Sequence, residues 1–257
     1  AAADDILQNQ TETFKAGDYK PVAVYSKGGE RFPKIGNSFD FFAFFHRPHY
    51  AIVEVQPVIP TLTEPGRAPL PLNFGTERVR ANAAQRPARR PAEIQRLGHV
   101  VLGTTRFGAA LDWYLDTLGL IVSDFLYLDG QRDRGPAMAF IRCDLGSVPA
   151  DHHTLAMALQ PHTGYVHSAY QLTDLDEVAS SGEYLREQGY RHAWGLGRHI
   201  QGSQIFDYWR DPDKIMFEHY TDGDMFDATM EPGWAPLSVS GLSQWGPRAT
   251  AEFTGTN

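Results

Sequence analysis

Two stretches of sequence decide the fold of this chain: Leu97–Gly103 (LGHVVLG) and Gly164–Leu172 (GYVHSAYQL). Each is a short, mostly apolar run, which predicts a strand. A helical pattern follows each run, and three further strand-like runs follow each helix. The order strand, helix, strand, strand, strand therefore occurs twice, with a period of roughly 65 to 70 residues, and this repeat is a supersecondary unit used twice.

The two helices are marked by their ends. Phe107–Leu118 carries apolar residues at helical spacing, and Gly119 follows as the expected C-terminal cap. In the second unit, Asp174 and Glu177 form a capping-box pattern at the start of a helix that runs to Gln188. The remaining predicted strands are Ile121–Leu128, Pro136–Cys143, His153–Gln160, Ala193–Ile200, Gln204–Trp209 and Lys214–Tyr220.

These patterns predict an α+β fold. Two tandem βαβββ units, at about 96–160 and 164–222, are expected to bring two curved sheets together as an incompletely closed barrel around a shared cleft. We place the catalytic domain that they form at 93–225, with a C-terminal extension at 226–257.

Residues 1–92 form a less regular N-terminal region. Phe39–Phe45 is a short apolar run, and Tyr50–Val58 alternates as a strand does. Between residues 64 and 91 the chain carries five Pro and six Arg, a composition typical of an extended connector.

The composition excludes several classes of partner. Lys and Arg total 23 against 31 Asp and Glu, a formal charge of −8, which argues against a nucleic-acid or anionic-membrane surface and favours a small-molecule partner. Cys143 is the single cysteine, so no intrachain disulfide forms. No run approaches the roughly 18 apolar residues of a membrane span, and the first residues lack the pattern of a secretory signal. We therefore expect a cytoplasmic protein, and a homo-oligomer that associates through its N-terminal segment.

Three residues of the repeat have the chemistry of a metal site. His99 and His167 occupy equivalent places in the first strand of each unit, 68 positions apart. Glu218 lies in the apolar and aromatic run Ile215–Tyr220, where a buried carboxylate needs a cation. Two imidazoles and one carboxylate are the ligands of the facial triad that holds non-haem Fe(II) with open positions. Zinc accepts the same ligands, so the residue types alone do not select the metal.

Residues 96–222 resemble the catalytic half of a type I extradiol ring-cleaving dioxygenase, a family of the vicinal oxygen chelate superfamily with a glyoxalase-like fold. Each motif is weak alone, but their order and spacing together are specific. The matching motifs are Leu97–Val100 (LGHV), Asp151–Ala156 (DHHTLA), His167–Tyr170 (HSAY), Gly197–His199 (GRH), Phe206–Tyr208 (FDY) and Glu218.

The resemblance implies that His99, His167 and Glu218 bind Fe(II), or less often Mn(II). It also implies that His153 is the acid/base histidine of the reaction. We expect the adjacent His152 to point to the opposite face of the strand, and therefore to be structural.

The resemblance further implies that His199 and Tyr208 form hydrogen bonds to substrate oxygens and to intermediates. Trp194, near His199 in sequence, is a candidate for the wall of an aromatic pocket. The other five histidines have no matching role, and we expect them to be surface or hydrogen-bonded core residues: His46, His49, His162, His192 and His219.

The implied activity is extradiol cleavage of a catechol-type diol by dioxygen. Both oxygen atoms enter a muconic semialdehyde-type product, so no nicotinamide or flavin is needed. Family members carry an N-terminal pair of βαβββ units without metal, and residues 1–95 are too few for two units. We therefore expect a reduced or incomplete non-catalytic domain there.

Two alternatives keep the same fold. A glyoxalase-like isomerase or lyase would take a fourth ligand from the last strand of the first unit, yet Thr154–Leu159 contains no carboxylate. A metal-free binding protein would not need the six site residues together. A nucleophilic role for Cys143 is disfavoured, because this residue ends an apolar strand.

Overall fold

The chain divides into two units, Ala1–Thr61 and Leu62–Asn257. The structure, a computed structural model, describes residues 23–24, 39–45, 51–57, 70–238 and 242–254. Within Ala1–Thr61, three strands form an antiparallel sheet in the order β1-β3-β2: β1 (Ala23–Val24), β2 (Phe39–Phe45) and β3 (Ala51–Pro57). The strands β2 and β3 correspond to the two strand-like runs predicted in this region. The domain limits predicted at residues 92/93 and 225/226 stay predictions.

The larger unit, Leu62–Asn257, contains both predicted βαβββ repeats. The first repeat consists of β4 (Arg96–Thr104), α2 (Phe107–Leu118), β5 (Leu120–Tyr127), β6 (Met138–Cys143) and β8 (Leu155–Leu159), with the short 3-10 helix η1 (Arg132–Arg134) and strand β7 (Ala150–Asp151). The second repeat consists of β9 (Gly164–Gln171), α3 (Leu175–Glu187), β10 (Arg191–His199), β11 (Ile205–Arg210) and β12 (Met216–Thr221). The predicted α+β class and the glyoxalase-like arrangement are confirmed.

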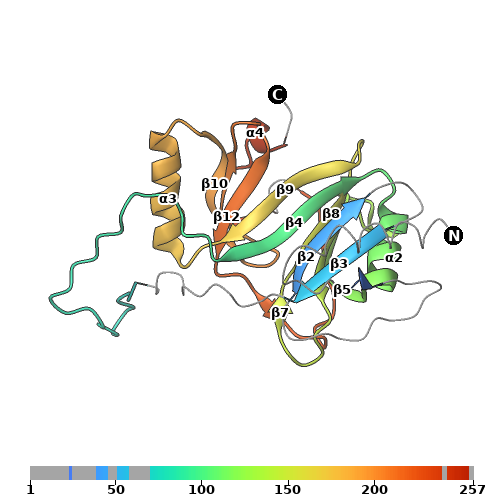
Figure 1. The fold of residues 1–257 in the computed structure, drawn as a ribbon, viewed down its shortest axis with the longest axis horizontal. Coiled ribbons are helices and arrows are strands. Elements are labelled where there is room, and N and C mark those ends of the chain that lie inside the picture. Colours follow the sequence, from blue (N-terminus) through green and yellow to red (C-terminus); the bar gives the residue numbers. More distant parts are fainter. Residues whose placement is uncertain (1–22, 25–38, 46–50, 58–69, 239–241, 255–257) are drawn as a thin grey trace. The chain divides into compact units, whose positions relative to one another are not determined.

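The two repeats share one continuous ten-stranded sheet. Its order is β14-β5-β6-β8-β4-β9-β12-β11-β10-β15, where the two outer strands are β14 (Gly233–Pro236) and β15 (Ser243–Trp245). The first strands of the repeats, β4 and β9, pair antiparallel at the centre and lie side by side in Figure 1. On either side, β8 runs parallel to β4 and β12 runs parallel to β9. This order relates the repeats by a pseudo-twofold axis between β4 and β9.

One helix from each repeat packs on the sheet. In the first repeat, α2 buries Phe107, Leu111 and Tyr114 against apolar residues of β5, β6 and β8. In the second, α3 lies against β10, β11 and β12 (Figure 1) and buries Val178 completely. Its N-terminus is capped as predicted, since the Asp174 carboxylate accepts a hydrogen bond from Glu177 N. The faces covered by the helices leave the other side of the central strands for the site.

The C-terminal extension completes the sheet, which the sequence did not predict. Its strands β14 (Gly233–Pro236) and β15 (Ser243–Trp245) pair with β5 and β10, while β13 (Met225–Phe226) pairs with β7; the helix α4 (Ala251–Thr254) ends the described chain. Arg142 fastens this extension. Its buried guanidinium donates hydrogen bonds to the backbone oxygens of Val122, Asp227 and Met230. The extension is therefore part of the folded unit Leu62–Asn257.

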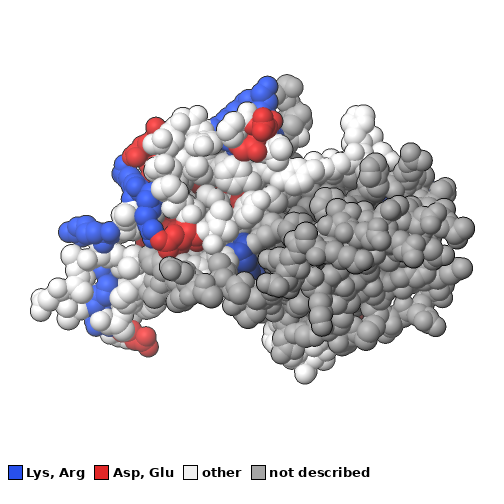
Figure 2. Space-filling view, viewed as in Figure 1, with Lys and Arg blue, Asp and Glu red and all other residues white. Residues whose placement is uncertain are grey.

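Charges on the visible face of the second unit are mixed. Lys and Arg side chains lie next to Asp and Glu over α3 and α4 in Figure 2, as in the ion pair of Arg186 with Glu183. Arg210 likewise pairs with Glu252 of α4. Among the described residues, no helix combines the length and the apolar character needed to cross a bilayer.

Substitutions at two glycines of the first repeat test where helix α2 ends. Gly119 ends the helix in the left-handed region (φ 65°), whereas Gly108 lies within it with open space around its Cα. We expect Gly119→Ala to lower the free energy of unfolding by about 1 kcal/mol, because a Cβ is strained at positive φ. The control Gly108→Ala should raise it by about 0.5 kcal/mol, since alanine favours the helix. Urea unfolding measures both, and equal effects would contradict the assigned helix end.

Candidate active site and metal centre

A row of side chains crosses the centre of the sheet on one face. His99 on β4 lies opposite Ala169 on β9, Ala169 lies beside Glu218 on β12, and Glu218 lies opposite Tyr208 on β11. Paired residues of neighbouring strands point to the same face, and so does His167, two positions before Ala169. Because Ala169 is small, it leaves space between His99 and Glu218.

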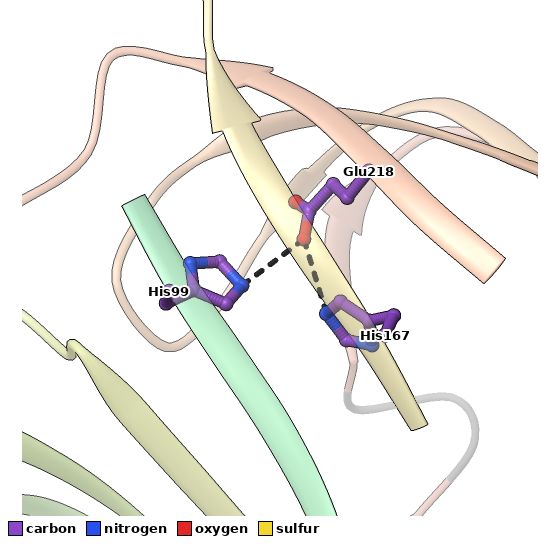
Figure 3. A group of neighbouring side chains, drawn as sticks. All are labelled: His99, His167 and Glu218. Carbon is purple, nitrogen blue, oxygen red and sulfur yellow. Dashed lines mark ion pairs between the residues drawn. The ribbon is translucent and has the colours of Figure 1, made fainter. Parts of the chain in front are cut away.

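The three predicted ligands converge in this space. Figure 3 shows the imidazoles of His99 and His167 turned toward one carboxylate oxygen of Glu218. Glu218 Oε2 lies 3.2 Å from His99 Nε2 and 3.3 Å from His167 Nε2. All three side chains are buried, and one ligand atom from each lies within 4.8 Å of the others. The three ligands therefore come from the first strands of the two repeats, β4 and β9, and from the last strand of the second repeat, β12.

Several polar atoms of this cluster lack hydrogen-bond partners. Among the described residues, neither oxygen of Glu218 and neither ring nitrogen of His167 has a hydrogen-bond partner, although Glu218 is 0% exposed. Burial alone would raise the pKa of Glu218, but the imidazoles of His167 and His99 hold it well below its usual value. Burial lowers the pKa of His167, which favours the neutral imidazole that binds metals. A buried carboxylate and a neutral imidazole without hydrogen-bond partners, with a second imidazole beside them, fit a divalent metal.

His153 lies at the edge of the same cluster. Its ring centroid is 4.1 Å from that of His99, and its side chain is buried. Burial, together with the nearby imidazoles of His99 and His152, lowers the pKa of His153 well below its ordinary value. The ring is therefore neutral near pH 7, so one of its nitrogens keeps a lone pair.

The expectation for His152 was wrong. Residues 152 and 153 lie between β7 and β8, so the alternation of a strand does not separate them. Instead the two rings touch, with His152 Nδ1 2.9 Å from His153 Nδ1, and His152 Nε2 lies 2.6 Å from Asp124 Oδ2. His152 is therefore a direct neighbour of the site.

His199 and Tyr208 form a hydrogen-bonded pair beside Glu218. His199 Nδ1 is 2.9 Å from the backbone oxygen of Leu242, which only accepts, so Nδ1 carries the hydrogen. His199 Nε2 then accepts from the Tyr208 hydroxyl at 2.9 Å. Burial and the Glu218 carboxylate raise the pKa of Tyr208 well above its usual value, which keeps the phenol protonated. The same Nε2 lies 3.7 Å from Glu218 Oε1.

Trp194 supports this pair and does not line an open pocket, contrary to expectation. It is 1% exposed and stacks on Tyr208, with ring centroids 5.7 Å apart and an interplanar angle of 14°. Its indole Nε1 donates a hydrogen bond to Pro247 O in the C-terminal extension. Trp194 therefore packs against the ring of Tyr208 and holds it in place.

The pseudo-twofold axis identifies a fourth corner of the site. Glu218 pairs with Ala169, the residue of β9 that lies opposite His99. By the same symmetry, the counterpart of Glu218 is the residue of β8 that pairs with Val101, because Val101 lies opposite His167. That counterpart is Ala156, which is completely buried and has no ligand atom. The structure therefore agrees with the expectation that this strand supplies no carboxylate.

Residues without a predicted role lie away from the cluster. His219 faces α3, where its Nδ1 is 3.4 Å from Ser181 Oγ, and His192 bonds Asp207 at 2.6 Å. His162 is exposed. His46 and His49 lie outside the described residues.

The Cys143 thiol lies 3.8 Å from Thr154 Oγ1, and burial raises its pKa, so it is a poor nucleophile.

Sequence reasoning missed two groups that contact the site histidines. Asp124 bonds His152, and the backbone oxygen of Leu242 bonds His199. An aspartate inside the apolar run Ile121–Leu128 was a visible signal for Asp124. A backbone oxygen leaves no signal in the residue types.

Comparisons with known proteins agree with this arrangement. A model of the Glyoxalase/Bleomycin resistance protein/Dioxygenase superfamily matches residues 96–219. The chain is 34% identical over 160 residues to metapyrocatechase 2 of Cupriavidus necator, covering 62% of this chain and 47% of that protein. It is 28% identical over 159 residues to an iron-dependent extradiol dioxygenase of Rhodococcus jostii (strain RHA1), covering 59% of this chain and 50% of that protein. The chain thus spans about half the length of these relatives.

Solved structures share the fold. A Mn(II)-bound glyoxalase from Novosphingobium aromaticivorans matches 96% of this chain and 69% of its own, with a TM-score of 0.58 and 21% identity. Homoprotocatechuate 2,3-dioxygenase from Brevibacterium fuscum matches 63% of this chain and 50% of its own, with a TM-score of 0.53 and 21% identity. At this identity the likeness is one of fold alone.

Metal binding tests the cluster. We expect Glu218→Gln to weaken binding of Fe(II) or Zn(II) by more than about 100-fold, since it removes the only anionic ligand of the three. Metal at about 100 times its dissociation constant should stabilise the wild type by about 2.7 kcal/mol, and the variant much less. Thermal unfolding with and without metal, together with the metal content per chain, measures both effects.

The matched control is His219→Gln, one residue further along β12 and turned toward α3. It should bind metal as the wild type does. Equal loss of metal in both variants, or full retention in Glu218→Gln, would contradict the assignment of the ligands.

Proposed function

We propose, from the match of residues 96–219 to the Glyoxalase/Bleomycin resistance protein/Dioxygenase superfamily, that the chain is the catalytic part of an extradiol dioxygenase. Its substrate class is a catechol-type aromatic diol, and its co-substrate is dioxygen. The product is a muconic semialdehyde-type acid that contains both oxygen atoms. The similarity to metapyrocatechase 2 and to the iron-dependent extradiol dioxygenase supports this proposal. Residues 93–225 form the catalytic domain in this proposal, and residues 1–92 a non-catalytic region.

One observation carries the proposal. Three buried ligands, His99, His167 and Glu218, share one face of the sheet, while the fourth corner is the apolar Ala156. A metal held by three protein ligands keeps open positions for a diol and for dioxygen together. A site with a fourth protein ligand would have fewer.

We propose Fe(II) as the metal, with Mn(II) as the alternative, held by His99, His167 and Glu218. Bound there, the metal would act as a Lewis acid toward the diol oxygens and provide redox chemistry with dioxygen. The iron dependence in the name of the Rhodococcus relative supports the choice of iron.

The surrounding side chains supply proton transfer and orientation. His153 is neutral and lies against His99, so it is placed to take a proton from a diol hydroxyl and later to return it. The Tyr208 hydroxyl, fixed by its hydrogen bond to His199, retains a lone pair that can accept a hydrogen bond from a substrate hydroxyl. Both groups therefore act on oxygen atoms of the same substrate.

Oxygen consumption tests the proposal. We would purify the protein without air, load it with Fe(II), add a panel of catechols with dioxygen, and follow oxygen uptake and visible absorbance. We expect one dioxygen consumed per catechol and a yellow product, both lost in His167→Ala. Metal binding without uptake for any catechol would favour the isomerase or lyase alternative, and absence of metal binding would favour the metal-free binding protein.

The orienting role of Tyr208 makes a further prediction. Tyr208→Phe should lower kcat by roughly 10- to 100-fold, because it removes a buried hydroxyl and leaves His199 Nε2 without its donor. Steady-state kinetics with the best catechol of the panel measures the effect. The control is Tyr165→Phe, whose hydroxyl bonds Ser168 and Met216 O outside the site, and which should retain wild-type kcat. Equal kcat in the two variants would exclude this role for Tyr208.

A further inference from the structure

His152 is held at each of its polar atoms. Its backbone N–H donates to Asp224 O at 2.8 Å, and its backbone oxygen accepts from Ser123 Oγ at 2.5 Å. Its ring nitrogens contact Asp124 Oδ2 at 2.6 Å and His153 Nδ1 at 2.9 Å. The side chain is completely buried, so its orientation and its hydrogen bonds are fixed together.

A bulge in β5 delivers two of these partners. The pairing of β5 with β6 shifts register between Val122 and Asp124. In a regular strand Ser123 and Asp124 would point to opposite faces, and the bulge lets both reach His152. The neighbouring strand β14 leaves space for the Asp124 carboxylate, because a Cβ on Gly233 would overlap Asp124 Oδ1. The local backbone is thus shaped around the contact between Asp124 and His152.

The hydrogen bonds of this network define the position of each proton. A carboxylate only accepts, so His152 Nε2 carries a hydrogen that it donates to Asp124. With the hydrogen of the His152 ring held at Nε2 by Asp124, Nδ1 presents a lone pair, and the contact between the two Nδ1 atoms assigns the donor role to His153. A neutral His153 with its hydrogen on Nδ1 has an unprotonated Nε2. Among the described residues, His153 has no other hydrogen bond, so Nε2 is the nitrogen available to the site.

We propose that Asp124 and His152 are positioning residues that fix the tautomer of His153 and leave its Nε2 as the proton acceptor of the active site. This inference rests on the proposed function, in which His153 takes a proton from the diol. The proton moves from a diol hydroxyl to His153 Nε2, and the resulting imidazolium still donates through Nδ1 to His152. No hydrogen bond of the network has to break, and the Asp124 carboxylate partly compensates the new positive charge.

Nitrogen NMR of the histidine rings tests the inference without any turnover. The probe is the 257-residue chain, labelled with ¹⁵N in histidine and loaded with Zn(II), a diamagnetic ion that accepts the same ligands. His152→Gln and His153→Gln variants assign the signals. We expect His152 to carry its hydrogen on Nε2 and His153 to carry it on Nδ1. The opposite tautomer of either ring would overturn the inference.

A variant pair links the tautomer to catalysis. Asp124→Leu removes the acceptor, so we expect His153 to lose its single tautomer and kcat to fall roughly 10- to 100-fold with little change in KM for the diol. The control is Asp129→Leu, on the exposed turn after β5, which should retain both. If Asp124→Leu does not fold, Gly233→Ala displaces the same carboxylate and should have the same effect.

The outcomes separate this inference from the proposed function. Unchanged His153 signals and unchanged kcat in a folded Asp124 or Gly233 variant would overturn the positioning role. A wild-type protein that cleaves no diol would contradict the proposed function, and the NMR experiment alone would then decide whether Asp124 and His152 fix the tautomer.

Discussion

The carboxylate of Glu218 is the constraint on which the rest of the site depends. It is completely buried, and no described residue offers either of its oxygens a hydrogen bond. Burying an isolated carboxylate is strongly unfavourable, and burial also disfavours the charged form of the neighbouring His167. A divalent cation shared by Glu218, His99 and His167 resolves this conflict, so we regard the cluster as a binding site that the fold holds ready.

The pseudo-twofold sheet explains why such a cluster arises and why it stays open. Pairing of β4 with β9 brings two equivalent histidines together at the centre, one from each repeat. Exact symmetry would also supply two carboxylates, but the repeats differ at this point, with Glu218 on β12 and Ala156 on β8. The difference converts a closed four-ligand arrangement into three ligands and a vacant side. In our proposal, that vacancy admits diol and dioxygen.

Most of the fold and the three metal-binding side chains could be predicted from sequence, because repeated strand and helix patterns mark equivalent positions such as His99 and His167. Contacts made through loops could not. The alternation rule failed for His152, because the residue lies between two strands, and the bulge that delivers Asp124 depends on the pairing of β5 with β6. The C-terminal strands are too short to give a periodic pattern, and Leu242 acts through its backbone oxygen. The roles of the six site residues stay proposals.

Anomalous diffraction from an anaerobic crystal of the Fe(II)-loaded chain, recorded at the iron edge, would locate the metal. We predict one strong peak per chain in contact with His99 Nε2, His167 Nε2 and Glu218 Oε2, with no protein ligand from the side of Ala156. A peak at other residues, or a loaded crystal in which Glu218 remains without a cation, would contradict it.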